Sequence, residues 1–385
     1  MQKSVLMALI ALITLNFSFF CSIRHGESSK KNIDFNSLKV IRKNVAHFSE
    51  LGKIKKAIKL ETIEDSLLGT VNLVVVDNAS GDLFISDNDS TRKVLRFNSE
   101  GKFITAYGKI GEGPGEYKRL IGFDINNSGD VCLLTQTKLI KYSKNGPLIK
   151  EKRLDFVASD ITIINDLIYI SIMDYRRDLK NKKAILLMDE GFEEVGRIGI
   201  YDPRIEKYKF MGLNVLAKRK GKLYYIENYD LAINIFAPMT RESFQLTVPN
   251  ENADLEKTWG KRRLSENDRQ KIRNKIHRFV KIHGYYNGLF LIEMCREKNI
   301  FDCWLLNLEK KVNIIVPFNS MVGGSEKNLY FDLISGSYSN GIIGVFDNAE
   351  VFNRYKGNYS ILKDIEFKNE DNPILVFFEF DQLAK

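Results

Sequence analysis

The 385-residue chain is predicted to be an all-β protein built from repeated four-stranded antiparallel sheets, and three observations carry this prediction. Short apolar or alternating runs recur along the chain, each bounded by a cluster of Gly, Asn, Asp or Ser, which is typical of strands joined by turns. The connections between consecutive runs are short, which indicates antiparallel pairing. The same order of strands returns every 40 residues or so, roughly the length of one propeller blade.

The clearest unit runs from Val71 to Tyr117. Its strands are predicted at 73–76, 83–86, 93–97 and 102–107, and a glycine-rich connector follows at 108–117. Four short strands that each pair with the next make one blade of a β-propeller. The composition, with 44% hydrophobic and 28% charged residues, is that of a chain able to bury a sizeable core.

Later parts of the chain repeat this order less regularly. Further units are predicted to begin near Gly122, Asp160, Asn214, Leu289 and Leu329, which gives six blades. The alternating segment 53–60 precedes the first unit, where an isolated strand would leave its backbone unpaired. In a propeller this segment can join the last blade and close the ring. The sequence therefore predicts a six-bladed β-propeller of four-stranded antiparallel blades.

One segment breaks the pattern. Residues 251–281 are highly charged and place Ile272, Ile276 and Phe279 at helical intervals, which predicts a helical insertion between blades 4 and 5. Its basic face is interpreted as solvated in preference to anion-binding. The long connector 348–372 is expected to form another feature at the rim.

The charge balance is moderately basic. The chain has 58 Lys+Arg against 49 Asp+Glu, a formal charge of +9, which could suit an anionic partner. The basic runs are short and lie in predicted strands and turns, not on one continuous surface. A solvated surface is therefore favoured, and nucleic acid is not expected as a partner.

The N-terminus is typical of an export signal. Lys3 is followed by an apolar stretch at 5–20 and then by Cys21, and this stretch is short for a membrane span. It resembles a bacterial lipoprotein signal, which implies that residues 1–21 form a signal peptide and that Cys21 is lipidated; the alternative is an uncleaved anchor. Residues 22–44 are polar and are interpreted as a tether. Residues 45–385 then form a single propeller domain.

Three cysteines remain after Cys21. Cys295 and Cys303 flank a predicted hairpin turn, so they could form a disulfide in an oxidising envelope or remain two buried thiols on neighbouring strands, and the sequence leaves both alternatives open. Cys132 lies in a predicted strand and is assigned to the core. No Cys/His spacing resembles a zinc site, so no metal ligands are assigned.

The glycine-rich connector is the most distinctive local motif. Gly111, Gly113 and Gly115 are expected to permit positive φ in a tight crossing between blades. Glu116 and Tyr117 could reach a ligand at the mouth of the channel. A structural role for the connector is favoured over ligand contact.

A second candidate is the acidic run Asp87-Asn88-Asp89, which follows an apolar strand. At a rim these three side chains could contact a ligand, and their oxygens could hold Ca²⁺. The run lacks the frame of an EF-hand, and Asx turns that end the strand are the favoured interpretation.

The connector also carries a family resemblance. Gly108-Lys-Ile-Gly-Glu-Gly-Pro-Gly-Glu-Tyr117 follows Gly101-Lys-Phe-Ile and precedes Phe123-Asp-Ile, and together they resemble the interblade motif of the six-bladed β-propeller lipoproteins. These are envelope proteins related to NHL-repeat propellers. The segment from Asp371 to Val376 is similar to the C-terminal strand of that family. The resemblance implies a propeller anchored by its acyl group in the bacterial envelope, on the periplasmic or surface face of the outer membrane. It implies no reaction.

No linear catalytic motif is present. The chain has neither a Gly-x-Ser-x-Gly elbow nor a His-Glu-x-x-His sequence, and no cofactor is predicted. Two functions from different classes remain. The first is a non-catalytic binding or scaffold module for a glycan, a peptide or an envelope protein. The alternative is a propeller enzyme of lactonase, lyase or glycan-cleaving type with a divalent metal in the central channel.

Overall fold

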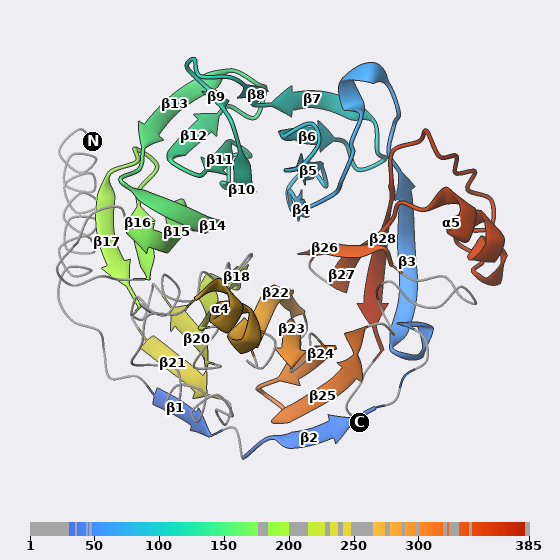
Figure 1. Cartoon of the computed structure of the whole chain (residues 1–385). Coiled ribbons are helices and arrows are strands. Elements are labelled where there is room, and N and C mark those ends of the chain that lie inside the picture. Colours follow the sequence, from blue (N-terminus) through green and yellow to red (C-terminus); the bar gives the residue numbers. More distant parts are fainter. Residues whose placement is uncertain are drawn as a thin grey trace, which may run out of the picture.

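The protein is mostly β, and its sheets form a propeller-like ring (Figure 1). A computed structural model describes residues 31–34, 37–43, 45, 48–175, 184–199, 215–227, 232–237, 242–247, 265–273, 278–286, 289–296, 300–318, 322, 331–338 and 341–381. Within these ranges, most strands pair antiparallel with the strand that follows them in the chain.

The first three groups of strands follow one another directly along the chain. The first comprises β4 (Leu73–Val76), β5 (Leu83–Asp87), β6 (Lys93–Phe97) and β7 (Phe103–Tyr107). The second comprises β10 (Leu120–Ile125), β11 (Val131–Thr135), β12 (Lys138–Tyr142) and β13 (Leu148–Arg153). The third comprises β14 (Phe156–Ile164), β15 (Leu167–Tyr175), β16 (Ile185–Met188) and β17 (Glu194–Ile198). Between the first two groups, β8 (Lys109–Ile110) and β9 (Glu116–Tyr117) form a small parallel sheet in the glycine-rich connector.

The remaining groups complete the ring. One comprises β18 (Leu216–Arg219), β19 (Lys222–Glu227), β20 (Ala232–Ala237) and β21 (Glu242–Thr247). The next comprises β22 (Arg278–Tyr286), β23 (Leu289–Arg296), β24 (Ile300–Asn307) and β25 (Val312–Pro317). The last comprises β26 (Leu333–Tyr338), β27 (Gly341–Phe346) and β28 (Ile374–Phe380). The first strand of each group lies nearest the centre of the ring, and the last lies at the periphery except in the last group, where β3 lies outside β28 (Figure 1).

The two ends of the domain meet in one sheet. β3 (Gly52–Lys59) pairs antiparallel with β28, and Lys59 lies opposite Ile374. The prediction that segment 53–60 joins the last strand group is therefore confirmed. A parallel contact between Gly336 of β26 and Val74 of β4 links this group to the first, which makes one eight-stranded sheet. A Cβ at Gly336 would lie 2.3 Å from the carbonyl oxygen of Val74, so this close approach requires glycine.

The predicted tether is corrected where the structure describes it. β1 (Lys31–Asp34) pairs in parallel with β21, and β2 (Lys39–Arg42) pairs in parallel with β25. Each adds a fifth strand to the outer edge of a sheet. β1 and β2 lie on the outside of the ring, where polar residues are tolerated, and each pairs with the edge strand of the sheet that it extends (Figure 1). Polar composition alone did not distinguish such an edge strand from a tether.

The predicted helical insertion is shorter than expected. A helix, α4, spans Glu266–Arg273, but Arg278 begins strand β22, so the helical interpretation of residues 278–281 is wrong. These residues pair with β23, where Arg278 lies opposite Cys295 and Lys281 opposite Glu293. Pairing with the following strand, β23, has overridden a helical spacing of apolar residues. Residues 251–264 and 274–277 of the insertion lie outside the described residues.

The long connector between β27 and β28 carries a helix, α5 (Ala349–Tyr355). Asn348 caps it by accepting a hydrogen bond from the Val351 amide at 3.0 Å. Phe352 is fully buried between Phe346 and Phe367. The connector therefore packs on the outside of the ring beside β3 and β28, away from the centre (Figure 1).

The apolar core lies between neighbouring sheets. One buried cluster joins Phe84 and Tyr107 of the first group to Phe123 and Leu133 of the second. The other clusters bridge the remaining neighbours in the same way. Each sheet therefore covers its apolar faces with the sheets on either side, and the closed ring is the stabilising unit.

Candidate functional site

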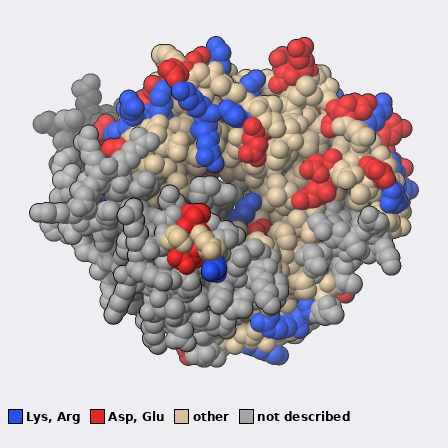
Figure 2. All heavy atoms as spheres, in the orientation of Figure 1, with Lys and Arg blue, Asp and Glu red and all other residues tan. Residues whose placement is uncertain are grey.

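The centre of the ring contains a cavity of about 660 Å³. Its lining comes from the innermost strand of every group and the turns that follow: residues 73–79, 123–127, 160–165, 216–218, 220–221, 281–283 and 335–338. Figure 2 shows the corresponding face hollowed at its centre, with acidic and basic side chains visible inside. A volume of this size is within the range of small-ligand sites.

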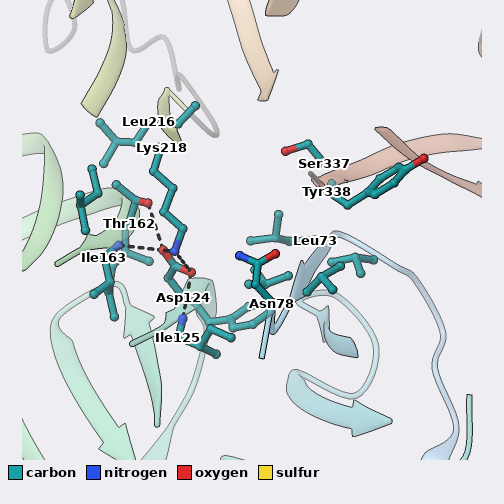
Figure 3. Close-up of a pocket in the computed structure, with 18 of the residues that line it drawn as sticks. Leu73, Asn78, Asp124, Ile125, Thr162, Ile163, Leu216, Lys218, Ser337 and Tyr338 are labelled. Carbon is teal, nitrogen blue, oxygen red and sulfur yellow. Dashed lines mark hydrogen bonds and ion pairs between the residues drawn. The ribbon is translucent and has the colours of Figure 1, made fainter. Parts of the chain in front are cut away.

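An ion pair dominates one wall of the cavity (Figure 3). The ammonium of Lys218 donates to both carboxylate oxygens of Asp124, at 2.8 Å to Oδ1 and 2.6 Å to Oδ2. Oδ2 also accepts from the hydroxyl of Thr162 at 3.0 Å and from the amide of Ile163 at 2.7 Å, and Oδ1 accepts from the amide of Ile125 at 2.8 Å. Asp124 is buried and its oxygens are fully engaged by protein donors, so it links three strands, β10, β14 and β18.

A second buried carboxyl lies on the next strand of the ring. Asp160 accepts from the amide of Ile161 at 2.9 Å and from the amide of Leu216 on β18 at 2.8 Å. Burial raises the pKa of Asp160 to about 7, and the charge of Asp124 acts in the same direction. The two aspartates make the same kind of contact, in which a carboxylate on one inner strand accepts a hydrogen bond from a backbone amide on the inner strand of the next group.

A third polar group comes from β22 and β23. Lys281 lines the cavity and donates to the carbonyl oxygen of Ile334 at 3.2 Å. His283 lies two residues further along, and its Nε2 contacts Glu293 Oε1. Burial lowers the pKa of both Lys281 and His283. Burial would raise the pKa of Glu293, but the neighbouring His283 and Lys281 hold it below its ordinary value.

Two further polar side chains face the same space, and neither has a hydrogen-bond partner among the described residues. Neither the amide of Asn78, which follows β4, nor the hydroxyl of Ser337, near the end of β26, makes a hydrogen bond to any described residue. In Figure 3 both are directed toward the space that Lys218 borders. The ring of Tyr338 instead packs against Phe377, with the ring centroids 5.0 Å apart. Polar groups from three separate strand groups therefore converge on one cavity.

The sequence candidates Asp87, Asn88 and Asp89 form a turn away from this cavity. Asp87 is buried, and its carboxylate accepts from the amides of Gly69 and Ser90, each at 2.8 Å. Burial would raise the pKa of Asp87, but these backbone hydrogen bonds hold it below its ordinary value. Asn88 donates to a backbone carbonyl, and Asp89 accepts from the Asn72 amide group. These contacts are those of the Asx-turn interpretation.

The candidates in the connector also make local contacts. Glu116 accepts from the amide of Gly113 at 3.0 Å and pairs with Lys109 at 3.1 Å. The buried Tyr117 donates its hydroxyl to the Arg92 carbonyl oxygen at 2.7 Å. Neither residue lines the cavity. Both hold the connector in place between the first two strand groups.

The expected positive φ is found at only part of the connector. Gly115 has a φ of 73°, which favours glycine, whereas Gly113 does not have a positive φ, so that expectation is wrong for Gly113. A Cβ at Gly111 would lie 2.0 Å from Glu116 Oε2. Gly111 therefore makes room for the Glu116 side chain, and Gly115 makes the turn.

The cysteine alternatives are decided for the described chain. Cys295 and Cys303 lie on neighbouring strands, but Cys295 is opposite Phe301 and Cys303 is opposite Glu293. Both are buried thiols and are not joined by a disulfide. The two cysteines are therefore offset by two residues along the paired strands and do not lie directly opposite each other. The expected lipidation residue, Cys21, lies outside the described residues.

Sequence reasoning missed the residues that line the cavity. Asp124 and Asp160 each interrupt an apolar strand, in Phe123-Asp124-Ile125 and in the run Ser159-Asp160-Ile161. A carboxylate in the middle of an inner strand was the available signal, because such a group must find partners in the channel. Lys218, the partner of Asp124, lies 94 residues away in sequence, so no local pattern could reveal this ion pair.

Two features are absent from the described residues. No cluster of three or more His, Cys, Asp or Glu side chains with the arrangement of a metal site occurs among them. No helix in the described part of the chain has the length and apolar character needed to cross a membrane.

The fold has counterparts among solved structures. A protein from Bacteroides fragilis described as exported matches with a TM-score of 0.68 and 18% identity, over 91% of this chain and 100% of that chain. A PQQ-bound aldose sugar dehydrogenase from Streptomyces coelicolor matches with a TM-score of 0.42 and 16% identity, over 86% of this chain and 100% of that chain. The first similarity shows a shared fold, and the second is too weak to support an argument. No curated protein matches the chain.

A family description also matches. The family described as "Domain of unknown function (DUF4934)" covers residues 31–379, which includes β1 at one end and nearly all of β28 at the other. Because this match spans most of the chain and the whole ring of sheets, the protein belongs to the DUF4934 family.

Proposed function

We propose that this protein is a lipid-anchored envelope protein of the six-bladed propeller type, which binds a small polyhydroxy ligand such as the end of a glycan in its central channel. One observation carries the proposal. The amide of Asn78, the hydroxyl of Ser337 and the remaining N–H of Lys218 converge on one cavity, and the first two have no partner among the described residues. Sugar hydroxyls both donate and accept, so they match this set of groups.

The charge of the cavity wall supports a neutral ligand. Lys218 and Asp124 compensate each other at 2.6 Å. Asp124 has no oxygen left without a protein donor, so binding a cation there would require breaking hydrogen bonds to Thr162 and Ile163. No specific observation at this wall favours the alternative of a metal-dependent enzyme.

The blade count supports the proposed type. The described strands fall into consecutive groups of four when β3 is counted with β26, β27 and β28. On this reading the eight-stranded sheet is two blades joined by the Gly336–Val74 contact, and β1 and β2 are additions to the outer edges of two others. The resulting number of blades is six.

The envelope location rests on the sequence and on a structural relative. The stretch before Cys21 is typical of a lipoprotein signal. The matching protein from Bacteroides fragilis is described as exported. A ligand in the envelope, such as a glycan, would then be within reach of the anchored domain.

A thermal unfolding screen tests the proposed function. The mature protein, starting after Cys21, is heated with a panel of mono- and oligosaccharides, each with and without a chelator. A ligand that binds the native state raises the midpoint by mass action. We expect a sugar-dependent rise that survives the chelator. A rise that requires Ca²⁺ or Zn²⁺ and disappears with chelator would instead support the metal-dependent enzyme.

A further inference from the structure

Lys281 is a channel lysine whose ammonium group contacts a carbonyl oxygen in place of a carboxylate. It lies on β22 and lines the cavity, and its side chain is half-buried. Its ammonium nitrogen, Nζ, donates to the carbonyl oxygen of Ile334 at 3.2 Å. A neutral carbonyl satisfies one N–H but does not balance a positive charge.

The two channel lysines, Lys218 and Lys281, differ in the partners of their ammonium groups. Lys218 contacts Asp124 directly, at 2.6 and 2.8 Å. Lys281 has no carboxylate within ion-pairing distance in the described part of the chain. An ammonium held away from bulk water without a contacting carboxylate is destabilised relative to the neutral amine. Burial accordingly lowers the pKa of Lys281, and the more distant charges of Glu293 and Asp160 act in the opposite direction.

The Lys281 amine lines the cavity and contacts only a carbonyl oxygen, so its nitrogen is available as a nucleophile, and a carboxyl group lines the same cavity. Asp160 lines the same space, and its raised pKa of about 7 means that much of it carries a proton near neutral pH. His283 and Glu293 form a hydrogen-bonded pair behind the lysine. A half-buried lysine without a contacting carboxylate, in a cavity that a carboxyl group also lines, is an arrangement suited to imine formation.

We propose that Lys281 is the reactive amine of a carbonyl-binding site, at which a small open-chain sugar or related aldehyde or ketone forms a reversible imine. The proposal rests on the proposed function, because it names the part of the ligand that is held most deeply. The hydroxyl groups of the ligand would meet Asn78, Ser337 and Lys218 nearer the channel mouth.

The chemistry balances without an oxidant or reductant. The nitrogen lone pair of Lys281 attacks the carbonyl carbon, and one proton moves from nitrogen to oxygen to give a carbinolamine. The hydroxyl group then leaves as water with a proton from Asp160, while the nitrogen forms the C=N bond. Loss of the remaining N–H proton returns a proton to the Asp160 carboxylate. The net result is one imine and one water, and hydrolysis reverses it.

Reductive trapping tests the proposal. The mature protein is incubated with glyceraldehyde, a small hydroxyaldehyde, and sodium cyanoborohydride, which reduces an imine to a stable secondary amine. Intact mass and peptide mapping then locate the adduct. We expect early modification to concentrate on Lys281, at a rate at least tenfold above that of any exposed lysine. Lys220, which is exposed and lines the same cavity, is the internal comparison.

Two variants complete the test. Lys281→Met keeps the length of the side chain and should abolish the fast adduct, whereas Lys220→Met should leave it unchanged. Because Lys281→Met could disturb the fold, the rate ratio between lysines in the wild-type protein is decisive by itself. Adducts spread over the exposed lysines with Lys281 unmodified would overturn the proposal.

A second ligand separates this proposal from the proposed function. Glycerol, the alditol of the same length, has hydroxyl groups but cannot form an imine. In one outcome, longer alditols and non-reducing sugars raise the unfolding midpoint, while the matching aldoses leave no trapped adduct at Lys281. This result would support the binding function and refute the imine. Trapping at Lys281 without any stabilisation by alditols would support the imine and refute recognition of hydroxyl groups.

Discussion

The titration of Asp160 offers the most quantitative test of the buried channel wall. Its pKa is raised to about 7 from an ordinary value of 3.8, chiefly by burial. A shift of about three units corresponds to about 4 kcal/mol, at about 1.36 kcal/mol per unit. Because the folded-state pKa is the higher one, folding favours the protonated carboxyl. The associated stability is present below about pH 4 and is lost as the pH rises through 7.

The perturbation is Asp160→Asn, which keeps the shape and removes the titration. Other groups also titrate, and the lowered pKa of His283 makes stability rise with pH in the same region. The informative quantity is therefore the free energy of unfolding of wild type minus that of the variant, measured by denaturant unfolding from pH 5 to 8. We expect this difference to fall by roughly 2 to 3 kcal/mol as the pH rises across that range.

The control is Asp155→Asn, at an exposed position just before β14. Its difference from wild type is the baseline against which that of Asp160→Asn is compared. The reasoning about Asp160 would be refuted by a flat difference for Asp160→Asn, or by one that increases with pH. Either result would mean that the carboxyl is ionised at no cost in the folded protein.

Three further predictions concern the ring and its turns. Asp87→Ala should lower the free energy of unfolding by about 2 to 4 kcal/mol, because several backbone amides lose their acceptor, and denaturant unfolding measures this; a loss below 0.5 kcal/mol would contradict the turn assignment. Gly115→Ala should cost about 1 to 2 kcal/mol more than Gly113→Ala, since only Gly115 has a positive φ, and equal midpoints for the two variants would refute the assignment. A chain that starts at residue 61 lacks β3 and should lose cooperative unfolding and aggregate, whereas a chain that starts at residue 45 keeps β3 and should unfold cooperatively. Size-exclusion chromatography and thermal unfolding compare the two, and a monomeric, cooperative shorter chain would show that ring closure is dispensable.

The strand order was largely predictable because each strand and its partner are close in sequence. A turn rich in Asn, Ser and Gly joins Leu73-Val-Val-Val76 to Leu83-Phe-Ile-Ser86. The sequence predicts this turn, and the two strands pair as expected. The alternation at 53–60 also predicted the pairing with β28, more than 300 residues away. That inference succeeded because an unpaired strand at the start of a ring has only one open edge to join.

The errors arose where strand pairing or the path of the backbone, and not the residue pattern, decides the local conformation. Phe279 and Val280 fit a helical spacing after Ile272 and Ile276, but β23 supplies a pairing edge that fixes residues 278–281 as a strand. The sequence shows a glycine at 113 and at 115 alike, and only the path of the connector shows which one has a positive φ.

The channel was the least predictable part. The channel residues Asp124, Asp160, Lys218 and Lys281 come from four strand groups, and each is surrounded in sequence by ordinary strand residues. Their chemistry depends on the closed ring, which places them around one cavity and removes them from bulk water. The motif that does stand out in the sequence, the connector at 108–117, serves the fold.

The most direct test of the central claim is a calorimetric titration with the most stabilising sugar from the screen, applied to wild type and to two variants. Asn78→Ala with Ser337→Ala removes from the channel two polar groups that have no partner in the described part of the chain, whereas Asn145→Ala removes an exposed amide from the turn between β12 and β13. Loss of two hydrogen bonds of about 1 kcal/mol each should weaken binding by roughly 10- to 100-fold in the channel variant and leave Asn145→Ala unchanged. Equal affinity in all three proteins would place the ligand outside the channel and contradict the account.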